Sequence, residues 1–352
     1  MTGAPSDSDL ARALAAFPEL VHPVAVPLAG GLIHHTFAVV AHDGEYILQR
    51  VHPLFAPVVH DNIAAVTDHL RRKHVPAPRL LTSSAGQPWA DLGPEGVWRV
   101  MTRLPGVSFH TVQSPSQARA AGAQVGRFHA ALTDLEHTFK IVRQTHDTPT
   151  HLATLRAAVA EHTGHRLHAD VAALAAEVFA GHADLPAPGD VPLRVGHGDL
   201  KFNNLLFSGT GPKDQLTPTG IIDLDTVDRM PLHRELGDAW RSWCNRGGED
   251  QAVAAFDLEI FAASLEGWLS ALTAPPTPHE RRALVHGVEW ISLELTARFA
   301  ADALRECYFG WDRARFPAAG EHNLLRARGQ WALHQATLAT RDARAELLLA
   351  GT

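Results

Sequence analysis

Residues 194–207 read RVGHGDLKFNNLLF and residues 220–225 read GIIDLD, and these two segments decide the predicted fold. Asp199 and Asn204 have the interval that the motif His-x-Asp-x-x-x-x-Asn places between a catalytic base and a metal-binding asparagine. Phosphoryl transfer also needs a second carboxylate for Mg²⁺ and a cation near the γ-phosphate. Asp223 and Lys201 can supply these two groups, so the segments predict a site for phosphoryl transfer.

Each residue of this stretch has its own expected role. We expect Asp199 to be the base, or the group that orients the attacking hydroxyl, and Lys201 to lie beside the transferring phosphate. Asn204 and Asp223 offer the oxygen ligands that Mg²⁺ prefers. His197 is expected to support the loop through hydrogen bonds. Ordinary loop polar residues are the plain alternative, but the interval, the added lysine and the apolar strand before Asp223 argue against it.

The length and composition of the chain limit its class. A chain of 352 residues is long for one compact core, so we expect two lobes. Its 45% of hydrophobic residues and 20% of charged residues fit a soluble globular protein. The net charge of −7 gives no electrostatic reason to expect nucleic acid or an anionic membrane as a partner. We expect a monomer or homodimer whose partner is a small-molecule acceptor.

The start of the chain is acidic and polar, where a signal peptide would be basic and then apolar. Only two cysteines occur, which suits a reducing compartment. The sequence therefore predicts a cytoplasmic protein.

Short β-type runs dominate the first hundred residues. Strands are expected over residues 24–28, 36–41, 45–50 and 96–101, and helices over residues 6–17 and 61–74. The Pro-Gly pair that follows Leu104 suits a hinge. We therefore expect a nucleotide-binding lobe over residues 1–104 and a helical lobe with the acceptor site over residues 105–352.

The candidates for phosphate binding lie in this first lobe. The turn from Gly30 and Gly31 to Thr36 can bring backbone amides close to phosphates, although a hairpin turn without a ligand is an equal alternative. Arg50 ends the strand on which a protein kinase carries its phosphate-pairing lysine. The strand register leaves Gln49 as the alternative at that place, and an edge arginine in solvent remains open too.

The candidates for adenine binding are Met101 and Leu104. They lie where a strand meets the expected hinge, whose backbone can bind adenine. The ligand expected here is ATP.

Helices dominate the second part of the chain. They are expected over residues 116–132, 152–165 and 171–181 and from residue 234 to the end, with strands over residues 191–196, 204–207 and 217–222. The predicted fold class is α+β, a bilobal protein-kinase-like fold with a small β-rich N-lobe and a large helical C-lobe.

The motif resembles a known superfamily. Residues 197–204 together with Ile221-Ile-Asp223 are similar to the aminoglycoside phosphotransferase/choline kinase superfamily, whose fold is protein-kinase-like. More narrowly, residues 46–50, 199–204, 222–227 with 235–241, and 323–330 resemble its N-acetylhexosamine 1-kinase branch. The resemblance implies that Asp199 is catalytic and that Asn204 and Asp223 bind Mg²⁺.

The resemblance also implies an acceptor pocket. Its candidate residues, which would face or support a sugar, are Asp225, Asp238, Arg241, Arg326 and Arg328. A buried ion pair of Arg241 with Asp238, and a surface position for the other two arginines, are the alternatives. The branch has Thr where this chain has Leu200, which leaves the acceptor open.

These features predict a small-molecule kinase that depends on ATP and Mg²⁺. Its expected acceptor is the anomeric hydroxyl of a sugar or N-acetylhexosamine. An aminoglycoside, a choline-like amine or homoserine is the alternative acceptor, although Arg326 and Arg328 argue against a cationic ligand. A nucleotide-binding pseudokinase is the alternative of another class.

Overall fold

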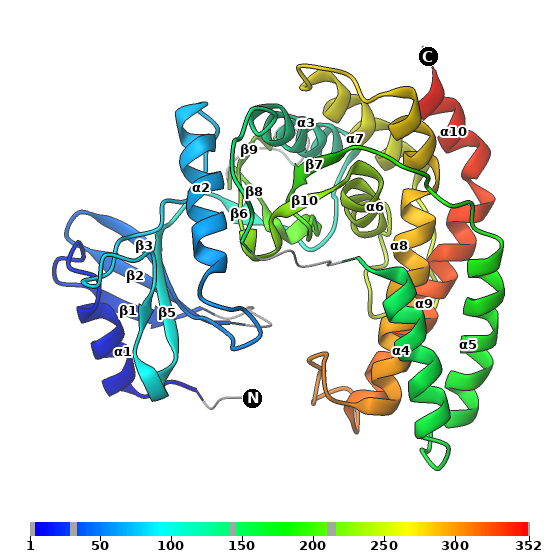
Figure 1. Cartoon of the computed structure of the whole chain (residues 1–352), viewed down its shortest axis with the longest axis horizontal. Helices are drawn as coiled ribbons and strands as arrows, with labels where there is room; N and C mark the ends of the chain where they lie inside the picture. The colour runs from blue at the N-terminus through cyan, green and yellow to red at the C-terminus, as the bar shows by residue number, and fades with distance from the viewer. Residues whose placement is uncertain (1–3, 29–33, 141–145, 210–215, 351–352) are drawn as a thin grey trace.

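The computed structural model describes residues 4–28, 34–140, 146–209 and 216–350. Figure 1 shows an antiparallel sheet near the N-terminus, set apart from a mostly helical region that contains the rest of the chain. This arrangement confirms the predicted α+β class. The proposed boundary near Leu104 falls between strand β5 (Val97–Thr102) of the first sheet and strand β6 (Val107–Ser108), which pairs inside the second region.

The N-terminal sheet has the order β1-β2-β3-β5-β4. Its other strands are β1 (Val24–Pro27), β2 (His35–Ala41), β3 (Gly44–Arg50) and the two-residue β4 (Ala90–Asp91). All pairs are antiparallel, as short hairpins around Asp43-Gly44 require. The four longer strands lie within two residues of their predicted positions, whereas β4 is too short to leave a periodic signal.

One face of this sheet packs on helix α1 (Asp7–Ala15). The helix begins at Ser6, whose side chain accepts from the Asp9 backbone while the Asp9 side chain accepts in return. Ala13 and Phe17 join Leu48 and Trp98 of the sheet in one buried cluster. The sheet therefore has one covered face, and its other face points toward the helical region.

Helix α2 (Val59–Arg72) connects the two parts. Its buried residues Ile63, Val66 and Leu70 belong to the large cluster that also contains Val125 of helix α3 (Pro115–Ala131). The two helices that the sequence predicted in this part of the chain therefore differ in their packing. Helix α1 covers the sheet, while α2 packs on the core of the helical region, as Figure 1 shows.

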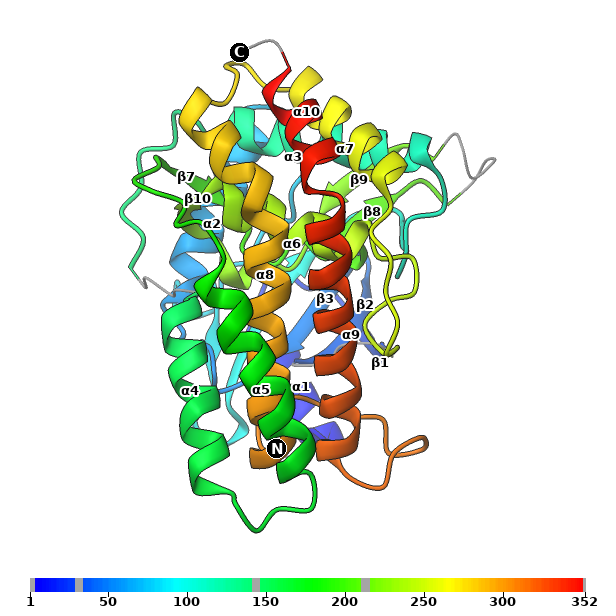
Figure 2. The same cartoon turned by 90° about the vertical axis from the view of Figure 1, so that its right-hand side faces the viewer.

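The helical region is built around two close helix crossings. Helix α3 (Pro115–Ala131) crosses α7 (Leu258–Ser270), and α6 (Leu232–Trp243) packs on α8 (Pro278–Arg305). Figure 2 shows α4 (Thr148–Glu161), α5 (His168–Ala183) and α9 (Ala319–Ala339) side by side with α8. The chain then ends with α10 (Arg341–Leu349). No helix among the described residues combines the length and apolar character needed to cross a bilayer.

Two small antiparallel sheets hold the motif of residues 197–223 in place. Strand β7 (Leu193–Gly196) pairs with β10 (Asp228–Pro231), and β8 (Leu205–Phe207) pairs with β6 and β9 (Pro218–Ile221). Between them lie the short 3₁₀ helices η2 (Phe202–Asn204) and η3 (Leu224–Thr226). The motif therefore starts at the end of one strand and finishes just beyond the end of another.

Candidate active site

The loop over residues 197–204 begins with a turn that only glycine fits. Gly198 has φ of +80°, and a Cβ placed there would lie 2.6 Å from the carbonyl oxygen of Thr226. The Thr226 hydroxyl donates to the carbonyl of His197 at 2.8 Å. The turn thus fixes the loop against η3, which follows Asp223 directly.

A buried carboxylate on α6 holds the same turn from behind. Glu235 accepts hydrogen bonds from the backbone nitrogens of His197 and Gly198 at 2.7 and 2.9 Å, and His129 Nε2 lies 3.1 Å from its Oε1. Burial raises the pKa of Glu235, but the hydrogen bonds from the His129 side chain and from the His197 backbone help to outweigh burial, and that pKa lies below its ordinary value. The carboxylate is therefore ionised and fixed.

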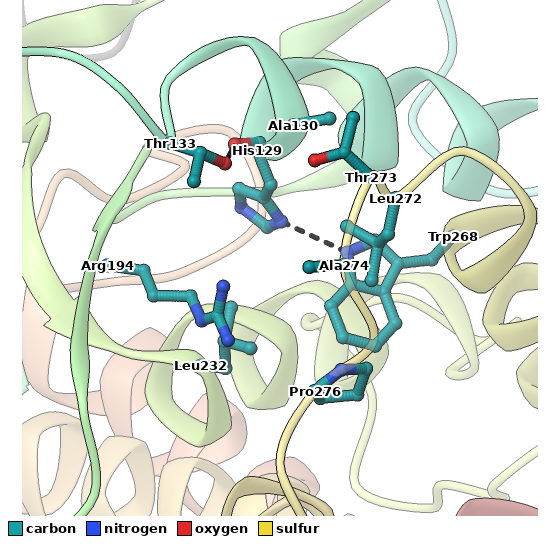
Figure 3. A pocket seen from close by; sticks show the side chains of 10 residues that line it. All are labelled: His129, Ala130, Thr133, Arg194, Leu232, Trp268, Leu272, Thr273, Ala274 and Pro276. Atoms are coloured by element: carbon teal, nitrogen blue, oxygen red, sulfur yellow. Dashed lines mark hydrogen bonds between the residues drawn. The ribbon is translucent and has the colours of Figure 1, made fainter.

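The orientation of His129 follows from its second partner. Trp268 Nε1 donates to His129 Nδ1 at 3.0 Å, drawn as the dashed line in Figure 3. His129 Nε2 must then carry the proton and donate to Glu235. Figure 3 shows that these rings line a pocket with Arg194 and Pro276; it lies behind the loop and does not contain Asp199.

His197 connects the two halves of the motif. Its Nε2 lies 2.8 Å from the carbonyl oxygen of Ile222, and the backbone nitrogen of Asp199 donates to its Nδ1 at 3.3 Å. A neutral ring with the proton on Nε2 satisfies both contacts. His197 thus supports the loop, as the sequence suggested, and keeps Asp199 next to the strand end that carries Asp223.

Asp199, Lys201 and Asn204 meet on one side of the loop. Lys201 Nζ lies 3.0 Å from Asp199 Oδ2, and Asn204 Nδ2 donates to the Asp199 carbonyl at 2.8 Å. Burial lowers the pKa of Lys201, but the carboxylates of Asp199 and Glu249 outweigh burial, so that pKa stays above its ordinary value. The lysine is thus a cation, and the amide oxygen is the end of Asn204 that a metal would bind.

Asp223 has the features of a metal ligand. Its backbone is left-handed, with φ of 67° and ψ of 58°, a conformation that costs energy for a residue other than glycine. The surrounding protein, which removes water from the Asp223 carboxylate, and then the nearby carboxylates of Asp225 and Asp199 raise its pKa to about 7, although part of the residue is exposed. A divalent cation would relieve this crowding of negative charge, so the donor set fits Mg²⁺.

The face of the N-terminal sheet opposite α1 carries two parallel rows of residues. The strand register puts Val26, Ala38, Ile47 and Met101 side by side in one row. Two residues further along each strand it puts Thr36, Gln49 and Arg99 side by side. Because paired residues share a face, an apolar row lies next to a polar row on the side that faces the helical region.

Arg50 lies on the opposite face of the sheet, with Leu48 and Trp98. A Cβ on Gly96 would be 3.2 Å from Arg50 Nε, and Arg50 is close enough to α1 to lower the pKa of Asp9 after the Ser6 hydrogen bonds. Of the two residues that the register left open, Gln49 therefore faces the helical region.

Arg99 connects the lobes and was missed by the sequence reasoning. It donates to both carboxylate oxygens of Asp225, with 2.7 Å between Nη2 and Oδ2, and His34 Nε2 lies 3.0 Å from the same Oδ2. Arg99 is only 2% exposed. The available signal was a single charged residue inside the apolar run Val97-Trp-Arg-Val-Met101, which usually marks a partnered charge.

Asp238 and Arg241 form a buried ion pair on α6. Arg241 Nη2 lies 2.9 Å from Asp238 Oδ1, and its Nη1 contacts Glu249, while Asp238 Oδ2 is buried without a partner among the described residues. Burial raises the pKa of Asp238, but Arg241, His146 and Lys201 outweigh burial and hold that pKa below its ordinary value. The pair therefore exists, and it lies beside the catalytic loop.

The two arginines of α9 point in different directions. Arg326 Nε donates to Asp250 at 2.8 Å and its Nη1 donates to the Gly310 carbonyl at 2.8 Å. Arg328 donates to Asp170 of α5 at 2.9 Å and is half exposed. Residues two apart on a helix project to different sides, so one pocket cannot take both.

The remaining nucleotide candidates are distributed as follows. Thr36 accepts from Gln49 Nε2 at 3.1 Å, and Met101 pairs with Ile47 in the apolar row. Leu104 lies against Gly220, where an added Cβ would approach its side chain to 2.5 Å. Gly30 and Gly31 lie outside the described residues.

The chain is similar to known proteins over most of its length. The family model described as phosphotransferase enzyme family matches residues 24–284. Among solved structures, an aminoglycoside phosphotransferase from Alicyclobacillus acidocaldarius has a TM-score of 0.60 at 16% identity and covers 98% of both chains. A choline kinase from Cryptosporidium parvum has a TM-score of 0.58 at 12% identity, covering 98% of this chain and 99% of its own.

A third solved structure contains ligands. It is an amicoumacin kinase in complex with AMP-PNP, Ca²⁺ and Ami, with a TM-score of 0.61 at 13% identity and 92% of each chain covered. At these identities the likeness concerns the fold, and it confirms the predicted kinase-like architecture.

Proposed function

This chain belongs to the phosphotransferase enzyme family, and we propose that it is an ATP- and Mg²⁺-dependent kinase that phosphorylates a hydroxyl group of a small molecule. The observation that carries the proposal is the meeting of Asp199, Lys201 and Asn204 in one loop that His197 fastens to the strand end before Asp223. This arrangement combines a base, a cation and two oxygen ligands, which are the parts that phosphoryl transfer requires.

The chemical step assigns a role to each side chain. Asp199 orients the acceptor hydroxyl and takes its proton as the oxygen bonds to the γ-phosphorus and the bond to the β,γ-bridging oxygen breaks. Lys201 stabilises the charge on the transferring phosphoryl group. Asn204 and Asp223 would hold Mg²⁺, which supplies electrostatic stabilisation of the phosphate oxygens when bound.

The nucleotide would lie under the N-terminal sheet. The apolar row of Val26, Ile47 and Met101 suits a purine ring, with the backbone near Met101 and Leu104 beside it. The row of Thr36 and Gln49 lies further along the same strands and suits the phosphates. The purine would thus lie against the apolar row and the phosphates against the polar row.

For the acceptor we propose a neutral polyol, namely a sugar or N-acetylhexosamine that is phosphorylated at its anomeric hydroxyl. Near the catalytic loop, carboxylates and guanidinium groups are paired, as in Asp238 with Arg241 and Asp250 with Arg326. Such pairs can form hydrogen bonds with the hydroxyl groups of a ligand. Because each pair has no net charge, it does not favour a cationic ligand over a neutral one. An anomeric hydroxyl is more acidic than an ordinary alcohol, so an ordinary carboxylate suffices as its base.

An amine-bearing acceptor is the second candidate. Asp238 Oδ2 is buried without a partner among the described residues, and such an oxygen would suit an ammonium group. Leu200, which stands where the sugar-kinase branch has Thr, favours the same alternative. The similar structures include one named as an aminoglycoside phosphotransferase and one named as a choline kinase.

A panel of sugars, amino alcohols and aminoglycosides tests both candidates. Each acceptor is incubated with Mg-ATP, and ADP release is measured together with the ³¹P NMR spectrum of the product. Coupling of the new phosphorus signal to an anomeric proton supports the proposed acceptor, and coupling to another carbinol proton rejects it. Asp199→Asn should lose at least about a hundredfold in kcat while it still binds nucleotide; unchanged kcat would reject the role of Asp199.

The same panel distinguishes a pseudokinase. A protein that binds Mg-ATP tightly but releases no ADP with any acceptor would fit a binding module. We propose an enzyme because Asp199, Lys201, Asn204 and Asp223 are all present.

A further inference from the structure

Strand β3 offers no cation to the nucleotide. Its only basic residue, Arg50, lies on the face covered by α1, and the residue that faces the helical region is the neutral Gln49. The phosphates of ATP carry several negative charges, and in kinase-type sites a basic side chain from this part of the sheet neutralises them. Another residue must therefore provide the positive charge.

Arg99 lies one strand away in the same polar row. Gln49 is its direct partner across the sheet, and Arg99 Nε donates to Gln49 Oε1 at 2.8 Å. Gln49 Nε2 in turn donates to the hydroxyl of Thr36 at 3.1 Å. The amide thus orients the guanidinium, because its oxygen faces Arg99 and its nitrogen faces Thr36.

The guanidinium of Arg99 lies close to one of the two expected metal ligands. Both of its terminal nitrogens contact Asp225, which is two residues after Asp223, and the Asp223 carboxylate is near enough to help raise the pKa of Arg99. A guanidinium has five N–H donors, and the contacts with Gln49 and Asp225 use three. One N–H group on each terminal nitrogen therefore has no partner among the described residues.

We propose that Arg99 is the cation that binds the phosphates of the nucleotide, positioned by Gln49 and Asp225. This inference rests on the proposed function. A protein kinase carries this positive charge on strand β3, whereas here it would lie on the neighbouring strand β5. Arg99 is on the face of the sheet that points toward the helical region, close to Asp223. Lys201 serves the acceptor side of the phosphoryl group and Arg99 serves the nucleotide side.

A purely structural role for Arg99 is the competing explanation. The ion pair with Asp225 joins the sheet to η3, so it could hold the lobes together without touching a ligand. The two roles differ in one respect. Loss of a purely structural ion pair should weaken the binding of adenosine, AMP, ADP and ATP equally. Loss of a phosphate-binding cation should weaken the binding of a nucleotide more, the more phosphates the nucleotide has.

The experiment compares adenosine, AMP, ADP and ATP in EDTA by isothermal titration calorimetry. The proteins are wild type, Asp225→Asn, and the double variant Arg99→Gln with Asp225→Asn, in which no buried charge is left unpaired. Relative to Asp225→Asn, the double variant should lose about tenfold or more in ATP affinity and less than about twofold in adenosine affinity. Arg99→Lys, which keeps the charge, should bind ATP more tightly than the double variant.

A matched control removes one arginine elsewhere in the same lobe. Arg79 pairs with Glu19 at 2.9 Å away from the polar row, so Arg79→Gln changes the net charge equally and should bind ATP like wild type. Equal losses for adenosine and ATP in the double variant, or no loss for ATP, would overturn the proposal. A wild-type protein that binds none of the four ligands overturns the proposed function as well, whereas wild-type binding that is independent of phosphate number overturns this inference alone.

Discussion

Glu235 holds His197 through a hydrogen bond of 2.7 Å from the backbone nitrogen of His197 to its carboxylate, and the same carboxylate accepts from Gly198. This buried charge therefore sets the start of the loop that carries Asp199. An ionised carboxylate can accept all of these bonds at once, and an amide cannot.

Glu235→Gln should impair both the loop and the fold. The new NH₂ group cannot accept from a backbone N–H, so we expect about 2 kcal/mol of lost stability and a kcat at least about tenfold lower. Urea unfolding and steady-state kinetics measure the two effects. Glu259, which is exposed at the start of α7, provides the control Glu259→Gln. Full activity of Glu235→Gln would show that the carboxylate does not set the loop.

The crossing of α3 and α7 depends on glycine. A Cβ on Gly267 would lie 2.0 Å from the Arg119 carbonyl, and one on Gly122 would lie 2.0 Å from the Ser264 carbonyl. Gly267→Ala should therefore destabilise the protein by about 2 kcal/mol or more, because the helices must move apart. The urea midpoint measures this. Gly310 has open space around its position, so Gly310→Ala should stay close to wild type; a similar loss in both variants would contradict the packing explanation.

The sequence indicated which residues of the motif lie together better than it indicated the orientation of side chains in the sheet. Asp199, Asn204 and Asp223 could be proposed as site residues because their spacing along the chain carries the signal. Arg50 and Gln49 could not be separated, because a shift of one residue in register exchanges the faces of a strand. The partner of Arg99 could not be found, because Asp225 is 126 positions away along the chain.

The helix boundaries show the same division between local and distant causes. Ser6 and the prolines at residues 76 and 78 mark the ends of α1 and α2 through local effects. The packing of α2 on the helical region depends on contacts with α3, which no local pattern reveals. The strand β10 was missed for the same reason, because it exists only as the partner of β7.

Two buried histidines should make the fold sensitive to acid. Burial, together with nearby positive charge, lowers the pKa of His60 and of His233 to about 4. The unfolded chain takes up these protons near pH 6.5 and the folded chain only near pH 4. The free energy of unfolding is therefore unaffected by these histidines above pH 6.5, and it decreases as the pH falls from 6.5 toward 4. Each histidine should reduce the free energy of unfolding by about 3 kcal/mol over this range.

Urea unfolding at pH 7 and pH 4.5 measures this loss. His233→Leu should reduce the difference between the two pH values by about 3 kcal/mol, because leucine binds no proton in either state. The exposed His110 provides the control His110→Leu, which should keep the wild-type difference. An unchanged difference in His233→Leu would mean that His233 does not cause the acid sensitivity.

Arg326 and Arg328 allow a test of which face of α9 serves the acceptor. Arg326 holds Asp250 and the Gly310 carbonyl, next to Glu249, which contacts Arg241 beside the catalytic loop. Arg326→Gln should therefore raise KM for the acceptor about tenfold, because a charge-assisted contact that orders this segment is lost, while KM for ATP stays within about twofold.

Arg328→Gln is the matched variant on the same helix. The Arg328 side chain is half exposed and pairs with Asp170 on α5. The substitution therefore removes only an exposed ion pair, which contributes little to stability. Both KM values should remain within about twofold of wild type. If Arg328→Gln raised the acceptor KM as much as Arg326→Gln, the acceptor would have to contact the α5 side of α9. The acceptor site would then have to be placed away from Asp250.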